Sequence, residues 1–261
     1  MDSERYGPWA LIVGGSEGIG AEMARQLAAD RFSLVLVARK AEPLDLLKAE
    51  LSALGVQVRI ASVDLSQAAA LDQVRAVTDD IDVGLLVYNA GANSVRGRFV
   101  ELDPAVTRAM LMINAWNQAE FARHYGARMA QRGRGGIILC GSSSSYLGAP
   151  TLAAYTGAKA FSRVFTEALW AEMEPLGVDV LHLLVNFTAT PAMERLGIDT
   201  SAAMTSADVA AQGLAHIARG PIFIAGGDRA LAMVEARSQV HDRADVVRKF
   251  ATPTREAIEK K

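Results

Sequence analysis

The segment from Trp9 to Ala28 constrains the fold of this chain most strongly. Five apolar residues, Trp9–Val13, are typical of a buried strand, and they lead directly into a glycine-rich turn over 14–20. Residues 21–28 then carry apolar side chains at helical spacing. This order is typical of a phosphate-binding loop, because glycines let the backbone approach a phosphate and the helix N-terminus offers free N–H groups. If the turn is not merely a tight turn without a ligand, its predicted contacts are Gly14, Ser16, Glu17, Gly18, Ile19 and Gly20.

Apolar runs and helical patterns alternate along the rest of the chain. The run Ser33–Ala38 is almost entirely apolar, as expected for a parallel strand that is buried on both faces. No internal repeat, low-complexity segment or linker is present, so one α/β domain over 1–261 is predicted. Residues 228–261 form a charged, helical C-terminal extension whose position the pattern does not predict. The expected strands are 9–13, 33–38, 56–63, 83–88, 137–141, 178–185 and 221–225, and the expected helices include 44–54, 67–78, 104–131, 155–174 and 206–218.

Candidate cofactor residues follow the first four predicted strands. In an open parallel sheet, the carboxyl ends of the strands meet at one edge, and ligands bind in the crevice there. Asp64 follows the third strand and is placed to contact an adenine amino group. The residues predicted at this edge are Gly14, Arg39, Asp64, Leu65, Asn89, Ala90 and Gly91.

Arg39 decides the predicted cofactor preference. It lies nineteen residues after Gly20, where a dinucleotide-binding fold meets the adenosine ribose. An acid at this position would accept the ribose hydroxyls and favour NAD, whereas a guanidinium can pair bidentately with the 2′-phosphate of NADP. Glu17 instead favours NAD, because its carboxylate would repel that phosphate. We therefore predict NADP(H) as the preferred cofactor, with NAD(H) as the alternative.

Tyr155 and Lys159 form a candidate acid–base pair. They lie one helical turn apart on one face of a predicted helix, although such a pair alone is more often solvated. A phenol titrates near ~10, and a nearby ammonium lowers that pKa. Ser142 follows the fifth strand and can hydrogen-bond the oxygen that is reduced or oxidised. Asn114 lies inside a predicted helix, where asparagine is unfavourable, so it is either a satisfied buried group or a catalytic one.

Composition excludes several classes of function. The formal net charge of −2 gives no reason to expect binding to nucleic acid or an anionic membrane surface. Cys140 is the only cysteine and the four histidines lack ligand spacing, so neither a disulfide nor a metal site is expected. No apolar run reaches about 18 residues and no signal core begins the chain, so no membrane span is expected. These features predict a cytoplasmic protein that binds a small molecule.

Together these motifs resemble those of the short-chain dehydrogenase/reductase family over about residues 9–225. The family's Thr-Gly-x-x-x-Gly-x-Gly motif corresponds to Val13–Gly20, and its Asn-Asn-Ala-Gly motif corresponds to Tyr88–Gly91. The resemblance implies a doubly wound (Rossmann) parallel sheet of seven strands with helices on both faces, and reversible hydride transfer between NAD(P) and a carbonyl or alcohol. The family's catalytic residues match Asn114, Ser142, Tyr155 and Lys159 in order.

The resemblance also implies a role for each residue. Tyr155 would exchange the proton, Lys159 would lower its pKa and hold the nicotinamide ribose, and Ser142 would polarise the substrate oxygen. Asn114 would hold a water that relays protons to Lys159. A homodimer or homotetramer is implied, with the helices over 104–131 and 155–174 against their counterparts. The implied contacts along the cofactor cleft include Asn89, Gly91, Thr188 and Thr190.

Three departures from the family pattern stand out. Val13 replaces the usual threonine, so a hydrogen bond from the turn to the fourth strand is missing, and Tyr88 replaces an asparagine. The usual Pro-Gly after the sixth strand is Val185-Asn186, where Asn186 can adopt a positive φ. Residues 188–206 are expected to be an irregular, mobile flap, followed by a helix with Ser206 as its N-cap.

The leading functional prediction is an NADP(H)-dependent oxidoreductase for a carbonyl or secondary alcohol. A lipophilic substrate is favoured because the candidate wall is mostly apolar, although Arg96 and Arg98 weaken that inference. One alternative is a nucleotide-binding sensor or scaffold without turnover. Another is non-redox chemistry on the same scaffold, such as epimerisation or elimination. The predicted substrate contacts are Ser142, Tyr146, Leu147, Tyr155, Phe187 and Met193.

Overall fold

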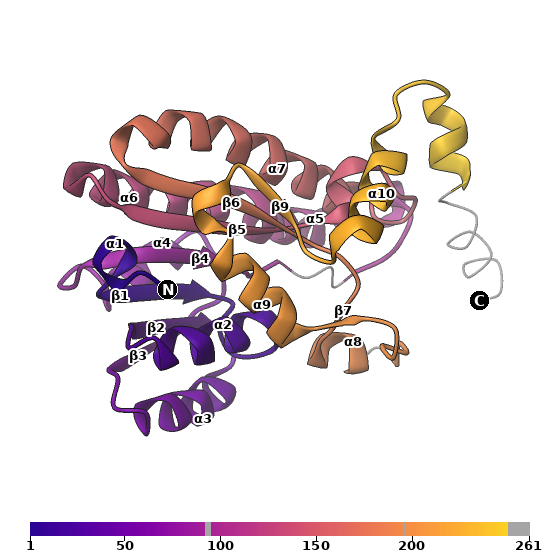
Figure 1. The fold of residues 1–261 in the computed structure, drawn as a ribbon. Helices are drawn as coiled ribbons and strands as arrows, with labels where there is room; N and C mark the ends of the chain where they lie inside the picture. Colours follow the sequence, from indigo (N-terminus) through magenta and orange to yellow (C-terminus); the bar gives the residue numbers. More distant parts are fainter. Residues whose placement is uncertain (92–94, 196, 250–261) are drawn as a thin grey trace.

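The computed structural model describes residues 1–91, 95–195 and 197–249. Seven parallel strands form one sheet in the order β3-β2-β1-β4-β5-β6-β9 (Figure 1). The strand order reverses between β1 and β4, which is the switch point where open α/β sheets bind ligands. The predicted doubly wound, seven-stranded fold is therefore confirmed. The strands are β1 (Trp9–Val13), β2 (Ser33–Ala38), β3 (Val58–Ser62), β4 (Val83–Tyr88), β5 (Gly135–Ser142), β6 (Val178–Val185) and β9 (Ile222–Ile224).

Helices cover both faces of the sheet. Successive strand residues point to opposite faces, so each strand supplies apolar side chains to a core on either side. Ala10 and Ile12 of β1 belong to the core beneath one helical layer, and Leu11 and Val13 belong to the core beneath the other. The first layer contains α2 (Gly18–Ala29), α3 (Ala41–Ser52) and α9 (Ser206–Ala215). The second contains α4 (Ala70–Arg75), α6 (Asn117–Arg132) and α7 (Ala153–Met173).

The helix expected over 104–131 is divided into three parts. Asp103 caps α5 (Pro104–Leu111) by accepting a hydrogen bond from Ala105 N. The π-helical turn η2 (Met112–Trp116) then joins α5 to α6. Turns of this kind occur often at functional sites, and this one contains Asn114.

Residues 188–205, which we call the flap, are more regular than expected. Strand β7 (Thr188–Ala189) pairs in parallel with β8 (Met204–Thr205), and α8 (Pro191–Arg195) lies between them. The prediction of Ser206 as N-cap is wrong by one residue. Thr205 caps α9 by accepting from Asp208 N at 3.0 Å, because the Ser206 hydroxyl instead donates to Ala189 O at 2.6 Å and holds the flap.

The C-terminal extension folds back onto the turn η3 (Ser143–Tyr146), which follows β5. Its helix α10 (Gly227–Ser238) packs against η3, where Arg237 Nη1 donates to Ser143 Oγ at 2.8 Å. Arg243 Nη2 donates to Tyr146 O at 2.5 Å. Residues 250–261 of the predicted extension lie outside the described part of the chain.

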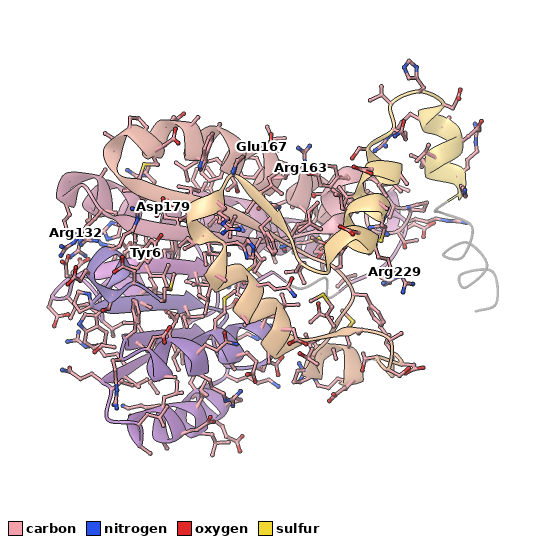
Figure 2. All side chains as sticks on the ribbon, viewed as in Figure 1. Tyr6, Arg132, Arg163, Glu167, Asp179 and Arg229 are labelled. Atoms are coloured by element: carbon pink, nitrogen blue, oxygen red, sulfur yellow. The ribbon has the colours of Figure 1, made fainter. Side chains whose placement is uncertain are left out.

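A polar contact lies at the amino ends of the strands, opposite the carboxyl ends. There the Tyr6 hydroxyl donates to Asp179 Oδ2 at 2.5 Å (Figure 2). Among the described helices, none is long and apolar enough to cross a membrane. The short elements are α1 (Ser3–Tyr6), η1 (Phe99–Glu101), η4 (Glu174–Leu176) and η5 (Ile217–Arg219).

Candidate active site

The glycine-rich turn is packed tightly against the carboxyl ends of β2 and β4. Gly14 N donates to Val37 O at 2.7 Å, and Asn89 Nδ2 donates to Gly14 O at 3.0 Å. A Cβ on Gly14 would lie 2.6 Å from Ala90 N, and one on Gly20 would lie 2.1 Å from Gly14 O. Glycine is therefore required at both positions by the packing of the turn itself.

The departures at Val13 and Tyr88, which are the last residues of β1 and β4, are compensated by other hydrogen bonds. Asn89 N and Ala90 N both donate to Val13 O, at 2.8 and 2.9 Å, so the backbone ties the turn to β4 without a threonine hydroxyl. Tyr88 is buried, and its hydroxyl donates to Ile113 O at 2.8 Å. Tyr88 thus fastens β4 to the π-helical turn that carries Asn114.

Asn114, Lys159 and Gly91 meet at one point. Lys159 is 3% exposed, and its Nζ donates to Cys140 O at 3.3 Å. The buried Asn114 donates from Nδ2 to Met110 O, while its Oδ1 has no hydrogen-bond partner among the described residues. A Cβ on Gly91 would lie 2.5 Å from Asn114 Oδ1 and 2.9 Å from Lys159 Nζ. Gly91 is therefore packed directly against an amide oxygen and an ammonium group, and a side chain at this position would collide with both.

Tyr155 and Ser142 lie beside these three residues. The Tyr155 ring centroid is 5.8 Å from Lys159 Nζ, and Ser142 Oγ accepts from Ser144 N at 3.1 Å. Burial raises the pKa of Tyr155, while the Ser142 hydroxyl acts to lower it. Burial also lowers the pKa of Lys159 to about 8. Loss of hydration is therefore the largest effect on the pKa of Tyr155, and its lowering by Lys159 stays a prediction.

The predicted adenosine contacts lie at the ends of β2 and β3. Hydrogen bonds from Ser66, with a smaller contribution from the charge of Arg39, lower the pKa of Asp64. The Arg39 side chain is exposed and makes no hydrogen bond or ion pair within residues 1–91, 95–195 and 197–249. Leu65 is buried, and its carbonyl accepts from Asn117 Nδ2 at 2.5 Å. Arg39 is thus available to a ligand, whereas Asp64 is already engaged by its neighbours.

Glu17 has a partner that the sequence pattern did not reveal. Arg195 donates from Nη1 and Nη2 to the two carboxylate oxygens of Glu17, at 2.8 and 2.5 Å. This ion pair, assisted by the charge of Lys40, lowers the pKa of Glu17. The two partners are 178 residues apart, so no local spacing signals their contact.

The threonines predicted near the nicotinamide also bond within the flap region. Thr188 Oγ1 donates to Asn186 O at 3.1 Å, and Thr190 Oγ1 accepts from Met193 N at 3.3 Å. Asn186 does not adopt the positive φ that was expected. Instead its Nδ2 donates to Ala225 O at 2.9 Å, which ties the end of β6 to the residue after β9.

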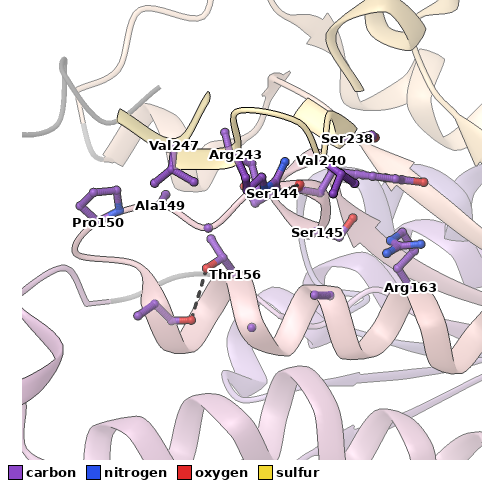
Figure 3. A pocket seen from close by; sticks show the side chains of 16 residues that line it. Ser144, Ser145, Ala149, Pro150, Thr156, Arg163, Ser238, Val240, Arg243 and Val247 are labelled. Carbon is purple, nitrogen blue, oxygen red and sulfur yellow. Dashed lines mark hydrogen bonds between the residues drawn. The ribbon is translucent and has the colours of Figure 1, made fainter. Parts of the chain in front are cut away.

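The predicted substrate residues fall into two groups. Tyr146 and Leu147 line a cavity of about 840 Å³ between η3, α7 and the C-terminal segment (Figure 3). Ser142, Tyr155, Phe187 and Met193 are not part of its lining. The guanidinium of Arg163 lies 4.5 Å from the Tyr146 ring centroid and pairs with Glu167 along α7 (Figure 2). The structure therefore places Tyr146 and Leu147 in a cavity separate from the flap residues.

The two arginines that weakened the prediction of a lipophilic substrate are both exposed. Arg98 Nη1 donates to Glu101 Oε1 at 3.3 Å, and this pair is on the surface. Phe187, directly before the flap, is 46% exposed and leaves an apolar ring open to a ligand. Within the described residues, no group of three or more histidine, cysteine or acidic side chains is arranged to hold a metal ion.

The relatives of this chain are named as dehydrogenases and reductases, which act on CH–OH or C=O groups. Residues 8–200 match the short chain dehydrogenase family, and this chain belongs to that family.

Relatives and solved structures agree with this assignment. A 7β-hydroxysteroid dehydrogenase of Clostridium sardiniense is 30% identical over 252 residues, covering 95% of each chain. A very-long-chain 3-oxoacyl-CoA reductase of Neurospora crassa is 35% identical over 197 residues, which span 74% of this chain but only 59% of that relative. A solved structure from work on 7β-hydroxysteroid dehydrogenase stereoselectivity has a TM-score of 0.88 and 28% identity, covering 95% of this chain and 98% of that one. A short-chain dehydrogenase from Sphingobium yanoikuyae in complex with NADPH has a TM-score of 0.77 and 30% identity, covering 88% and 93%.

Proposed function

We propose that this chain is an NADP(H)-dependent enzyme that reduces the carbonyl of a bulky, lipophilic molecule or oxidises the corresponding secondary alcohol. The observation that carries the proposal is the meeting of Asn114, Lys159 and Gly91 beside Tyr155 and Ser142, at the carboxyl edge of the sheet. Hydroxysteroids and oxosteroids are the first substrate class to test, because a relative that matches nearly the whole chain is a 7β-hydroxysteroid dehydrogenase.

The residues at this edge fit a dinucleotide. Glu17 precedes α2 but its side chain does not cap the helix, so the N–H groups of the first turn remain available to a pyrophosphate. The absence of a side chain at Gly91 lets the backbone approach Lys159, whose ammonium group would hydrogen-bond the ribose hydroxyls. Thr188 and Thr190, at the flap, would lie by the nicotinamide. When bound, the nicotinamide supplies or accepts the hydride.

The chain's own residues handle the proton. In reduction, the Tyr155 hydroxyl gives its proton to the substrate oxygen, and in oxidation the phenolate takes it back. The Ser142 hydroxyl holds the same oxygen in place by a hydrogen bond. Lys159 is fixed by the Cys140 carbonyl, and its positive charge stabilises the phenolate that remains after proton transfer. Asn114 Oδ1, which lacks a partner in the described chain, would accept a hydrogen bond from a water that returns a proton through Lys159.

We also propose that this chain assembles into a homodimer or homotetramer. Large apolar side chains are exposed on α5, on η2 and on α7, and these three elements pack against one another. A second copy that covered them would remove apolar surface from water. The side chains are Leu111, Trp116, Phe161 and Val164. A cytoplasmic location also belongs to the proposal, and the single buried cysteine fits it.

Arg39 should set the preference for NADP(H). We expect Arg39→Ala to weaken NADPH binding by about tenfold or more, because the bidentate pairing with the 2′-phosphate is lost. NADH binding should change by less than about threefold, because NADH lacks that phosphate. Dissociation constants from fluorescence titration of the free enzyme measure both effects. Arg123→Ala, at an exposed site on α6, is the matched control and should change neither constant. Equal losses for NADPH and NADH in Arg39→Ala would show that Arg39 does not bind the phosphate.

A further inference from the structure

The flap is joined to the glycine-rich turn by a bidentate ion pair. Arg195 is the last residue of α8, and its two terminal nitrogens each donate to a different oxygen of the Glu17 carboxylate. Both side chains remain partly exposed, at 57% for Arg195 and 43% for Glu17. A two-point pairing of this kind fixes the orientation of both groups more strictly than a single contact does.

A second contact seats the same helix on the same turn. A Cβ on Gly18 would lie 3.4 Å from the Thr190 methyl group and 3.8 Å from Pro191 Cδ. Thr190 also accepts a hydrogen bond from Met193 N at the start of α8. The beginning of α8 therefore lies over Gly18, and its end reaches Glu17. When the flap is seated in this position, Arg195 neutralises the charge of Glu17 in the turn.

The ion pair stands where the 2′-phosphate is expected. Lys40 follows β2 directly after Arg39, and its charge acts on the Glu17 carboxylate. The end of β2 and the glycine-rich turn thus place two cations and one anion around the adenosine ribose. A free carboxylate there would repel a 2′-phosphate, as the sequence already indicated. Arg195 occupies both oxygens of that carboxylate and cancels its charge.

We propose that Arg195 is a specificity-determining residue, which acts through Glu17: by neutralising this carboxylate, the seated flap allows the turn to accept the 2′-phosphate of NADP(H). The inference rests on the proposed function. NADP(H) affinity would then depend on Arg195, in the segment that borders the substrate, as well as on Arg39. Because binding couplings are reciprocal, NADP(H) in turn favours the seated flap.

Cofactor titrations of three full-length variants, compared with the wild type, test this proposal without requiring turnover. We expect Arg195→Gln to weaken NADPH binding by about five- to tenfold, since it leaves Glu17 unpaired beside the phosphate in a partly exposed site. NADH binding should stay within about twofold. Glu17→Gln in the Arg195→Gln background should restore NADPH binding to within about threefold of the wild type, because the repulsive charge is gone. Arg219→Gln, an exposed arginine of η5, is the matched control and should bind both cofactors normally.

Two outcomes would overturn the proposal. Equal weakening of NADPH and NADH by Arg195→Gln would mean that the ion pair only anchors the flap. Selective weakening of NADPH without rescue by Glu17→Gln would mean that Arg195 contacts the phosphate itself and does not act through Glu17. Neither outcome bears on the redox chemistry, which is read from turnover. Conversely, an inactive wild-type enzyme that still shows the rescue would overturn the proposed function and leave this inference standing.

Discussion

Replacing Tyr155 with phenylalanine should lower kcat by about a thousandfold, within the range lost with a general acid–base group. The ring remains and continues to fill the space beside Lys159, while only the hydroxyl that exchanges the proton is removed. Binding of NADPH should therefore stay within about threefold of the wild type, because no step of cofactor binding needs that proton. Steady-state kinetics with an oxosteroid and NADPH, together with a fluorescence titration, measure both quantities.

Tyr125→Phe is the matched control for that experiment. Tyr125 is buried and shares its hydroxyl in a hydrogen bond with Thr78, which follows α4. Its loss costs about 1 kcal/mol of stability and should leave kcat unchanged. Turnover by Tyr155→Phe at the rate of the wild type would remove Tyr155 from the catalytic role.

Replacing Lys159 with methionine should make the protein more stable and nearly inactive. Burial lowers the pKa of Lys159 from 10.5 to about 8, so the folded chain binds this proton less tightly than the unfolded chain does. Charging Lys159 therefore lowers the free energy of unfolding as the pH falls from about 10.5 to about 8, and the full decrease is present at neutral pH. The shift corresponds to about 3 kcal/mol at most, from which the lost hydrogen bond to Cys140 O subtracts. We expect Lys159→Met to be about 1–3 kcal/mol more stable at pH 7.

Urea unfolding at two pH values checks the sign of this effect. The stability advantage of Lys159→Met should shrink as the pH rises from 7 toward 10, because the wild-type lysine then loses its charge in the folded state. Turnover should fall by about a hundredfold or more at pH 7, since the phenolate of Tyr155 loses its stabilising charge. A variant that is less stable than the wild type at pH 7, or a difference that does not depend on pH, would contradict this account of Lys159.

Much of the fold could be predicted from the sequence because its strands carry a strong local signal. β1, β2, β4 and β6 are nearly uniform apolar runs that end at a glycine, charged or polar residue, and their observed bounds agree with those expected. The two-residue strands β7 and β8 could not be predicted, because two residues hold no periodic pattern. Their pairing depends on contacts between segments that are distant in sequence.

The positions of those site residues that follow strands could be predicted from the sequence. Gly14, Arg39, Asn89 and Ser142 lie at the carboxyl edge as expected, since parallel strands end there together. The π-helical turn around Asn114 was not foreseen, because it depends on how a buried asparagine packs within a helix. The Glu17–Arg195 pair and the separation of Tyr146 from the flap likewise result from tertiary contacts without a local signature.

We propose above all that this chain moves a hydride between a nicotinamide and a carbinol carbon. The most direct test supplies NADPH that carries deuterium at the reactive position of its nicotinamide ring, together with an oxosteroid in ordinary water. We predict an alcohol product with a single deuterium on the carbinol carbon, formed in an amount equal to the NADPH consumed, as mass spectrometry and NMR would show. Alcohol whose new C–H bond carries only solvent hydrogen, or tight NADPH binding without any reduction across a broad panel of ketones, would contradict it.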